Sequence, residues 1–175
     1  PTWSELKPLV RVEPPTLRRQ QAALRRAATV EDLRAMALRR TPRAVFDYVD
    51  GAAESELSLA RSRRAFADVE FRPRVLRDVS QVDSRVDVLG VTSPVPLILA
   101  PTGFTRMMHT EGEWAVGRAA ADAGVPYTLS TMGTVSLEDL AADLPDLQRW
   151  FQLYLWQDRA ASAALVRRAA DAGYQ

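Results

Sequence analysis

Small and polar residues follow two predicted strands, at points where a flat heterocyclic ring could bind. The apolar run 95–101 is followed by Thr102 and Gly103. A ring could lie against the backbone of Gly103, which has no side chain, while the Thr102 hydroxyl and the Gly103 amide bond its heteroatoms. The strand predicted over 126–130 leads into the sequence STMG at 130–133, whose two hydroxyls suit polar ligand atoms. An ordinary turn after a strand explains either segment as well.

The third predicted strand, residues 150–155, carries Gln152 and Tyr154. The two-residue period of a strand places both side chains on the same face. Polar side chains that point into a protein interior cost free energy unless they are bonded. A glutamine amide and a phenol aimed at one ligand account for the pair, and so does a core pair whose members bond each other.

His109 is the only histidine of the chain. Histidine is the commonest general base, but this one lies in a loop just before a predicted helix, where bonding to the backbone is the commoner role. The chain has no cysteine, no EF-hand pattern, no Walker motif and no GxGxxG. We therefore expect no metal site and no classical nucleotide loop.

The order of elements from residue 93 onwards indicates an α/β fold. The three predicted strands 95–101, 126–130 and 150–155 alternate with predicted helices at the spacing of βαβ units. A doubly wound parallel sheet and a (β/α)8 barrel both fit this order. Both architectures bind ligands at the carboxyl ends of the strands.

Helix caps support the same order of elements. Thr110 and Glu113 have the spacing of a capping box, and Ser136 and Asp158 are predicted to begin the next two helices. Gly124 suits the left-handed position that follows the end of a helix.

Three segments precede or make up this pattern. Residues 1–28 are predicted to be an irregular N-terminal extension with a short helix over 18–26, residues 29–92 a helical and short-strand segment, and residues 93–175 the first three β/α units of the fold. In the middle segment we expect a helix that Thr29 caps and that stops near Arg40, a second that begins at Pro42, and a third over 56–67. The alternation at 86–91 predicts short antiparallel strands.

The composition is that of a globular protein: 175 residues, of which 47% are hydrophobic and 26% charged. The 23 basic and 22 acidic residues give a net charge of +1, which provides no field to attract nucleic acid. No apolar run approaches the roughly 20 residues that span a bilayer. The first residues lack the basic segment and the apolar segment of a secretory signal peptide. We expect a cytoplasmic protein and leave room for a peripheral contact with the inner face of the cell membrane. Three strands cannot close a barrel of eight, so we also expect the chain to be part of a longer one.

Six short segments in register resemble the FMN-dependent α-hydroxy-acid dehydrogenases and oxidases. They are FDYVDGAAE at 46–54, FRPR at 71–74, APTG at 100–103, HTEGE at 109–113, TLST at 128–131 and WFQLY at 150–154. The Asp50-Gly51 pair and Met132 look closer to the L-lactate dehydrogenase branch than to plant glycolate oxidases. The resemblance implies that the chain is the N-terminal portion of a (β/α)8 barrel, preceded by a helical segment, with FMN at the strand ends.

The resemblance also implies roles for single residues. The flavin would lie against Pro101, Thr102 and Gly103, and Ser130 and Gln152 would bond its ring. The substrate would be held by Tyr48 through its carboxylate and by the catalytic Tyr154 near its hydroxyl, with Met132 shaping the room for its side chain.

The family oxidises L-2-hydroxy acids, and the resemblance implies oxidation of L-lactate to pyruvate by the complete protein. The histidine that takes the substrate proton lies in a later strand of the family and is not in this sequence; His109 matches a different position. We therefore expect residues 1–175 alone to be inactive. A quinone, a cytochrome or oxygen would accept the electrons, and a homotetramer would be the assembly.

Two other functions fit the same residues. Another FMN-binding barrel, an isomerase or a different oxidoreductase, would need the same ring site, although Tyr48 and Tyr154 favour a small acid as substrate. A half-barrel that serves as an interaction module without catalysis would explain why no base is present.

Overall fold

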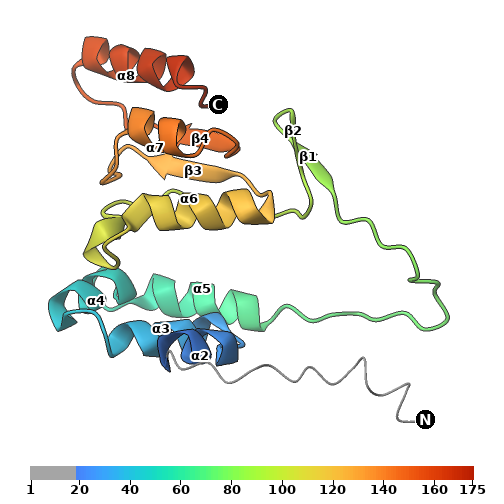
Figure 1. Cartoon of the computed structure of the whole chain (residues 1–175). Helices are drawn as coiled ribbons and strands as arrows, with labels where there is room; N and C mark the ends of the chain where they lie inside the picture. The colour runs from blue at the N-terminus through green and yellow to red at the C-terminus, as the bar shows by residue number, and fades with distance from the viewer. Residues whose placement is uncertain (1–18) are drawn as a thin grey trace. The chain divides into compact units, whose positions relative to one another are not determined.

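The computed structural model describes residues 19–175. Most of the predicted extension 1–28 lies outside the described residues, and its predicted short helix is present as α2, Arg19–Arg26. The chain divides into two compact units, Pro1–Asp47 and Tyr48–Gln175, and each is described by itself. Figure 1 labels the helices and strands along the chain.

The first unit contains α2, α3 (Val30–Leu38) and the beginning of α4 (Arg43–Asp50). Thr29 caps α3 as predicted, because its hydroxyl accepts the amide N–H of Asp32 at 3.2 Å and the Asp32 carboxylate accepts the amide N–H of Thr29 at 3.0 Å. The carbonyl of Pro42 accepts the N–H groups of Val45 and Phe46, both at 3.0 Å, and the helix begins at Arg43, one residue after the predicted start.

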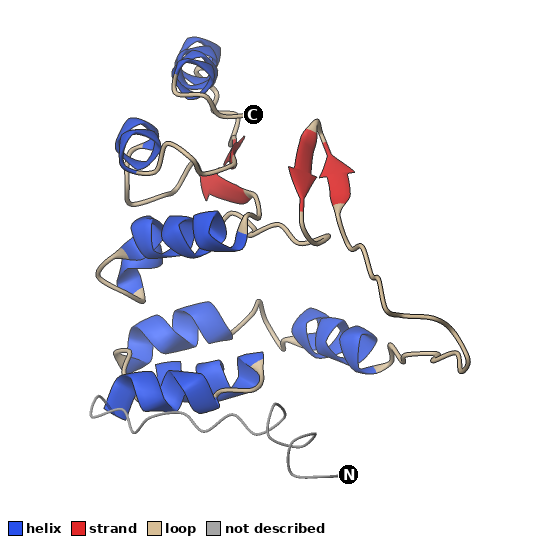
Figure 2. Cartoon of the chain, turned by 45° about the vertical axis from the view of Figure 1, so that its right-hand side comes forward, coloured by secondary structure: helices blue, strands red, loops and turns tan. Residues whose placement is uncertain are grey.

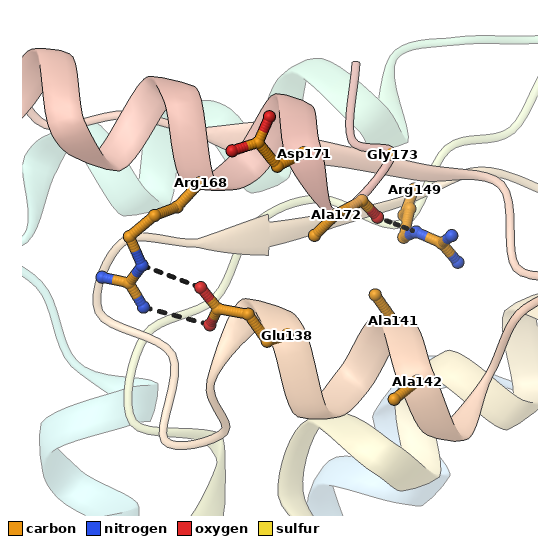
Figure 3. Close-up of a pocket in the computed structure, with 8 residues that line it drawn as sticks. All are labelled: Glu138, Ala141, Ala142, Arg149, Arg168, Asp171, Ala172 and Gly173. Carbon is orange, nitrogen blue, oxygen red and sulfur yellow. Dashed lines mark hydrogen bonds and ion pairs between the residues drawn. The ribbon is translucent and has the colours of Figure 1, made fainter.

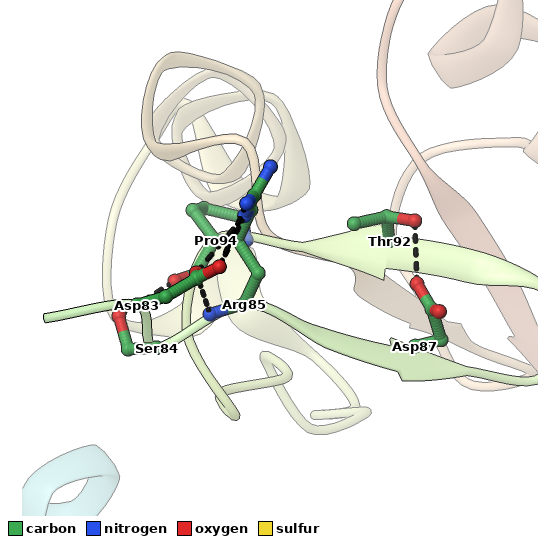
Figure 4. A network of polar contacts seen from close by, with 6 residues as sticks. All are labelled: Asp83, Ser84, Arg85, Asp87, Thr92 and Pro94. Carbon is green, nitrogen blue, oxygen red and sulfur yellow. Dashed lines mark hydrogen bonds and ion pairs between the residues drawn. The ribbon is translucent and has the colours of Figure 1, made fainter.

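The second unit begins with the end of α4, followed by α5 (Leu57–Ala67) and a β-hairpin. Strands β1 (Val86–Val88) and β2 (Val91–Ser93) pair antiparallel around Leu89 and Gly90, whose φ angles of 50° and 80° are those of a type I′ turn. Polar contacts support the hairpin, and Figure 4 shows the Thr92 hydroxyl donating to the carboxylate of Asp87 across the two strands.

The rest of the second unit alternates strands and helices, as predicted. Strand β3 (Tyr127–Ser130) pairs parallel with β4 (Arg149–Gln152), and helices α6 (Gly112–Ala123), α7 (Leu137–Asp143) and α8 (Arg159–Asp171) follow the successive strand segments (Figure 2). The core between sheet and helices consists of apolar side chains: Ala120, Val125, Tyr127, Leu129, Val135, Leu137, Leu140, Leu147, Ala169 and Tyr174. The described residues do not close a barrel.

The strand predicted over 95–101 is wrong in length, because only Leu99 pairs with β3. The N–H of Leu99 donates to the carbonyl of Pro126 at 2.9 Å, and its carbonyl accepts the N–H of Thr128 at 3.0 Å. These two bonds form a parallel bridge between Leu99 and Tyr127. Two of the seven residues are prolines, which have no N–H to offer a ladder, and the N–H of Leu97 turns back to Val95.

The predicted third strand, 150–155, is also shorter than expected. Strand β4 ends at Gln152, and the backbone then leaves the sheet, so that the N–H of Tyr154 donates to the hydroxyl of Thr131 instead of to a neighbouring strand.

The predicted capping box of Thr110 and Glu113 is wrong. Helix α6 begins at Gly112 after Glu111, and no side chain caps it. The carboxylate of Glu113 instead accepts two hydrogen bonds from Thr134 in the loop after β3. The predicted caps at Ser136 and Asp158 are confirmed, and Gly124 has the left-handed φ of 67° expected after α6.

Arg149 ties the ends of two helices to the start of β4 (Figure 3). Its guanidinium donates to the carbonyl of Ala172 at 3.2 Å, just after α8, and to that of Leu144 at 2.9 Å, just after α7. A cation is favoured at this place because helix dipoles are negative at the C-terminal end.

Among the described residues, no helix is long and apolar enough to cross a membrane.

Candidate functional site

The residues predicted to bind the flavin and the substrate all line one cavity of about 610 Å³. Its lining residues are Tyr48, Val49, Pro101, Thr102, Gly103, Phe104, Ser130, Met132, Gln152 and Tyr154. The list includes all eight predicted site residues and adds Val49 and Phe104, to which the sequence analysis gave no role in the site. The volume lies within the roughly 300–1,000 Å³ of cofactor and small-molecule sites.

The parallel register of the sheet brings Ser130 and Gln152 together. They are partners at the carboxyl ends of β3 and β4, and the Ser130 hydroxyl donates to the Gln152 side-chain oxygen at 3.0 Å. The amide N–H of Met132 in turn donates to the Ser130 hydroxyl at 3.1 Å. With its oxygen bonded, the Gln152 amide has its NH₂ group left to donate to a ligand.

The segment after Leu99 lies directly against the loop after β3. The amide of Phe104 donates to the carbonyl of Met132 at 3.0 Å, and a Cβ added to Gly103 would lie 2.9 Å from the Cβ of Met132. Glycine is therefore needed at position 103 for this close approach. The Gly103 N–H and the Thr102 hydroxyl make no hydrogen bond within residues 19–175, so both remain available as donors at the cavity wall.

The two cavity tyrosines are accessible. Tyr48 is 66% exposed and Tyr154 is 55% exposed, and both line the same cavity. A phenol can donate to a carboxylate or to an alkoxide without itself being charged at neutral pH. The pair therefore suits a small acid with a hydroxyl group.

Two residues that organise the site were not predicted as part of it. Thr131 was noted only for its hydroxyl, which here donates to the carbonyl of Gln152 and accepts the N–H of Tyr154 at 3.0 Å. Glu113 was predicted as a helix cap, but its buried carboxylate accepts two hydrogen bonds from Thr134, from the N–H at 2.8 Å and from the hydroxyl at 2.6 Å. Both links depend on contacts between distant segments, which the sequence does not display.

The charge state of Glu113 follows from these bonds. Burial by itself raises the pKa of the carboxyl, but the hydrogen bonds that it accepts, chiefly from Thr134, together outweigh burial, so the pKa lies below its usual value. Glu113 is therefore a buried carboxylate that stays ionised and holds the loop after β3.

His109 does not line the cavity. Its Nδ1 atom accepts the amide N–H of Glu111 at 3.3 Å, as the loop position before α6 suggested. Among residues 19–175 no group of three or more His, Cys, Asp or Glu side chains could hold a metal ion.

A second cavity of about 620 Å³ lies between α7 and α8, where Glu138, Arg149 and Arg168 contribute its polar atoms (Figure 3). Three of its four charged groups already have partners: Arg168 makes two hydrogen bonds to Glu138, at 2.7 and 3.0 Å, and Arg149 bonds main-chain carbonyls. It offers few free groups to a ligand, and we assign the site to the strand-end cavity.

Comparison with known proteins gives a consistent answer. A family model described as FMN-dependent dehydrogenase matches residues 37–175. The chain is 52% identical over 99% of its length to "Putative L-lactate dehydrogenase" of Mycobacterium tuberculosis (strain ATCC 25618 / H37Rv), and 42% identical over 83% of its length to glycolate oxidase of Spinacia oleracea. It covers 42% and 39% of these two relatives, so it spans about two fifths of their length.

Solved structures agree with the sequence relatives. A crystal structure of mandelate oxidase with 3,3-difluoro-2-hydroxy-3-phenylpropionic acid superposes with a TM-score of 0.80 and 42% identity, over 85% of this chain and 44% of that one. The cavity at the strand ends, the matched family model and these relatives lead to one conclusion: the chain belongs to the family of FMN-dependent dehydrogenases.

Proposed function

We propose that this chain supplies the flavin-facing and substrate-facing part of an enzyme that oxidises an L-2-hydroxy acid, with L-lactate as the substrate and pyruvate as the product. One observation carries the proposal: residues from three successive strand ends and from α4 line a single cavity. The names of the relatives, which include lactate, glycolate and mandelate enzymes, support the substrate class.

The residues present fit FMN. An isoalloxazine ring is flat and carries several acceptor atoms, and the cavity wall offers the Gly103 N–H, the Thr102 hydroxyl and the Gln152 NH₂ group as donors. The missing side chain at Gly103 lets this segment pack against Met132, which keeps the Gly103 backbone at the cavity wall. When bound, FMN supplies the two-electron oxidising power that no side chain of this protein has.

The substrate side of the cavity is assigned to Tyr48, Tyr154 and Met132. Tyr48 would donate to the carboxylate of the acid, and Tyr154 would stabilise the charge that develops on the substrate oxygen as its proton leaves. Met132, which is 41% exposed, would set the room for the substrate side chain.

The proton acceptor is proposed to lie outside this sequence, because His109 is the only histidine and does not line the cavity. We further propose that the parallel strands form one sector of a (β/α)8 barrel. A quinone, a cytochrome or oxygen as electron acceptor, a tetrameric assembly and a cytoplasmic location, with or without a peripheral membrane contact, belong to the same proposal.

Flavin spectroscopy tests this function. The purified complete protein should be yellow, and L-lactate added without oxygen should bleach the flavin band, whereas D-lactate should not. Tyr154→Phe should slow the bleaching about a hundredfold, as expected when one group that stabilises transition-state charge is lost. Tyr174→Phe is the matched control, since its phenol donates to the carbonyl of Leu137 outside the cavity.

Residues 1–175 expressed alone should not turn over L-lactate even with added FMN. Absence of bound flavin in the purified complete protein, or a flavin band of that protein that no 2-hydroxy acid bleaches, would overturn the proposed function. Glycolate and L-mandelate in the same experiment decide among the substrates named by the relatives.

A further inference from the structure

The hydroxyl of Thr131 joins the end of β3 to the segment that follows β4. It donates to the carbonyl of Gln152 at 2.5 Å, and the Thr131 amide donates to the same carbonyl at 3.0 Å. The hydroxyl also accepts the backbone N–H of Tyr154 at 3.0 Å. One oxygen atom thus contacts the backbone on both sides of Leu153.

Thr131 does not itself face the ligand cavity. It lines a separate space of about 290 Å³ whose walls include Leu129, Phe151 and Trp156. Because it is absent from the lining of the larger cavity, its hydroxyl would act on a bound ligand only through the residues that it holds.

The bond from the Tyr154 N–H to Thr131 lies beyond the end of the sheet. Strand β4 ends at Gln152, so no sheet ladder holds the backbone at residue 154, and more than half of the Tyr154 side chain is exposed. The next described backbone link along the chain is the N–H of Trp156, which donates to the hydroxyl of Ser162 at 3.0 Å. Between Gln152 and Trp156, the Thr131 hydroxyl is the one described partner of a backbone N–H.

We propose that Thr131 is a positioning residue, whose hydroxyl sets the place of the Tyr154 phenol in the cavity. The inference rests on the proposed function, because it gives Tyr154 its role. Valine has nearly the shape of threonine but no oxygen, so Thr131→Val removes the two hydroxyl bonds and keeps the packing. Thr131→Ser keeps the oxygen and loses only a methyl group.

The first measurement needs neither flavin nor substrate. Hydrogen exchange at the Tyr154 amide should be at least tenfold faster in Thr131→Val than in the wild type, because the amide loses its acceptor. Thr131→Ser should exchange like the wild type. Thr134→Val is the matched control: it removes a hydroxyl from the same loop, but that hydroxyl bonds Glu113, and the exchange of the Tyr154 amide should not change.

The second measurement is a double-mutant cycle in the complete flavin-loaded enzyme. Thr131→Val should lower the rate of flavin bleaching by the 2-hydroxy acid about tenfold, since small misplacements of a reacting group are costly. Thr131→Ser should restore the rate to within about twofold of the wild type. In a protein that already carries Tyr154→Phe, Thr131→Val should have almost no further effect, whereas Thr134→Val should have the same effect in either protein.

The outcomes separate the two proposals. Unchanged exchange at Tyr154 in Thr131→Val, or effects of Thr131→Val and Tyr154→Phe that multiply in an active enzyme, would overturn the positioning role and leave the proposed function intact. A wild-type protein that oxidises no 2-hydroxy acid would overturn the proposed function, and the catalytic meaning of the Thr131 bond with it.

Discussion

Replacing Glu113 by glutamine should destabilise the folded protein, although the two side chains have the same shape. The carboxylate accepts two hydrogen bonds from Thr134, one at each oxygen, and is fully buried. Glutamine can still accept the N–H of Thr134 with its oxygen and donate to the Thr134 hydroxyl with its NH₂ group, but it has no charge, so both bonds become neutral and weaker. We expect a loss of about 2 kcal/mol at neutral pH, which is typical of a hydrogen bond to a charged group.

The pH dependence identifies the cause. Burial raises the pKa of Glu113, but its hydrogen bonds, chiefly those from Thr134, lower it by more, so the pKa lies below its usual value and the ionised form stabilises the fold. This stabilisation is complete above the pKa of the unfolded chain, about 4.3, and is lost as the pH falls through the lower pKa of the folded protein. The free energies of unfolding of wild type and Glu113→Gln should therefore differ at pH 7 and converge in acid.

Equilibrium unfolding in urea at several pH values measures this difference, and hydrogen exchange at the Thr134 amide reports it locally. Glu111→Gln is the matched control: Glu111 lies two residues away, is exposed and pairs with Arg118, so its loss should cost less than about 1 kcal/mol. If Glu113→Gln is as stable as the wild type at pH 7, or if the difference in the free energy of unfolding does not shrink in acid, then the ionised carboxylate of Glu113 does not stabilise the fold through Thr134.

Three further substitutions have outcomes set by single contacts. Gly103→Ala should cost about 1–3 kcal/mol in unfolding experiments and weaken FMN binding in a fluorescence titration, because its Cβ would lie 2.9 Å from that of Met132; equal affinity would show that the loop yields freely. Tyr174→Phe removes a buried bond of 2.9 Å to the carbonyl of Leu137 and should cost about 1 kcal/mol. Burial raises the pKa of Tyr174 to about 12, so the wild type should lose stability above about pH 10, and a variant with the same alkaline loss would contradict this cause. Arg149→Lys cannot reproduce the fork that reaches several carbonyls and should lower the urea midpoint by more than Arg168→Lys does, the latter being an exposed pair.

Much of the fold could be predicted from local signals. The caps at Thr29, Ser136 and Asp158 and the left-handed Gly124 mark helix ends through bonds within a few residues, and the structure confirms each of them. The Glu113 cap failed because a tertiary partner competes for the same side chain. Thr134 offers the buried carboxylate two donors, whereas a cap offers one, and only folding brings Thr134 close.

The sequence could predict which residues lie together at the candidate site, but not which of their atoms form hydrogen bonds. Strand ends meet at one edge of a parallel sheet, so Gly103, Ser130 and Gln152 could be assigned to a common place from their positions alone. What the sequence could not provide is which atoms bond there. The side-chain oxygen of Gln152 accepts a hydrogen bond from Ser130, and the N–H of Tyr154 donates to the Thr131 hydroxyl. Both bonds depend on the register of β3 against β4.

The order of the strands bears on the architecture that the sequence left open. Leu99 pairs with β3, β3 pairs with β4, and Gln175 exchanges two parallel-type bonds with Arg149 and Phe151 of β4, at 3.1 and 2.9 Å. Four strand positions therefore follow one another in the sheet in chain order. The two common doubly wound orders, 3-2-1-4-5-6 and 2-1-3-4-5, contain at most three in sequence, because each reverses at the switch point where its ligand binds. A barrel has no such reversal and places its site over the carboxyl ends of consecutive strands, which is where Gly103, Ser130 and Gln152 lie around one cavity.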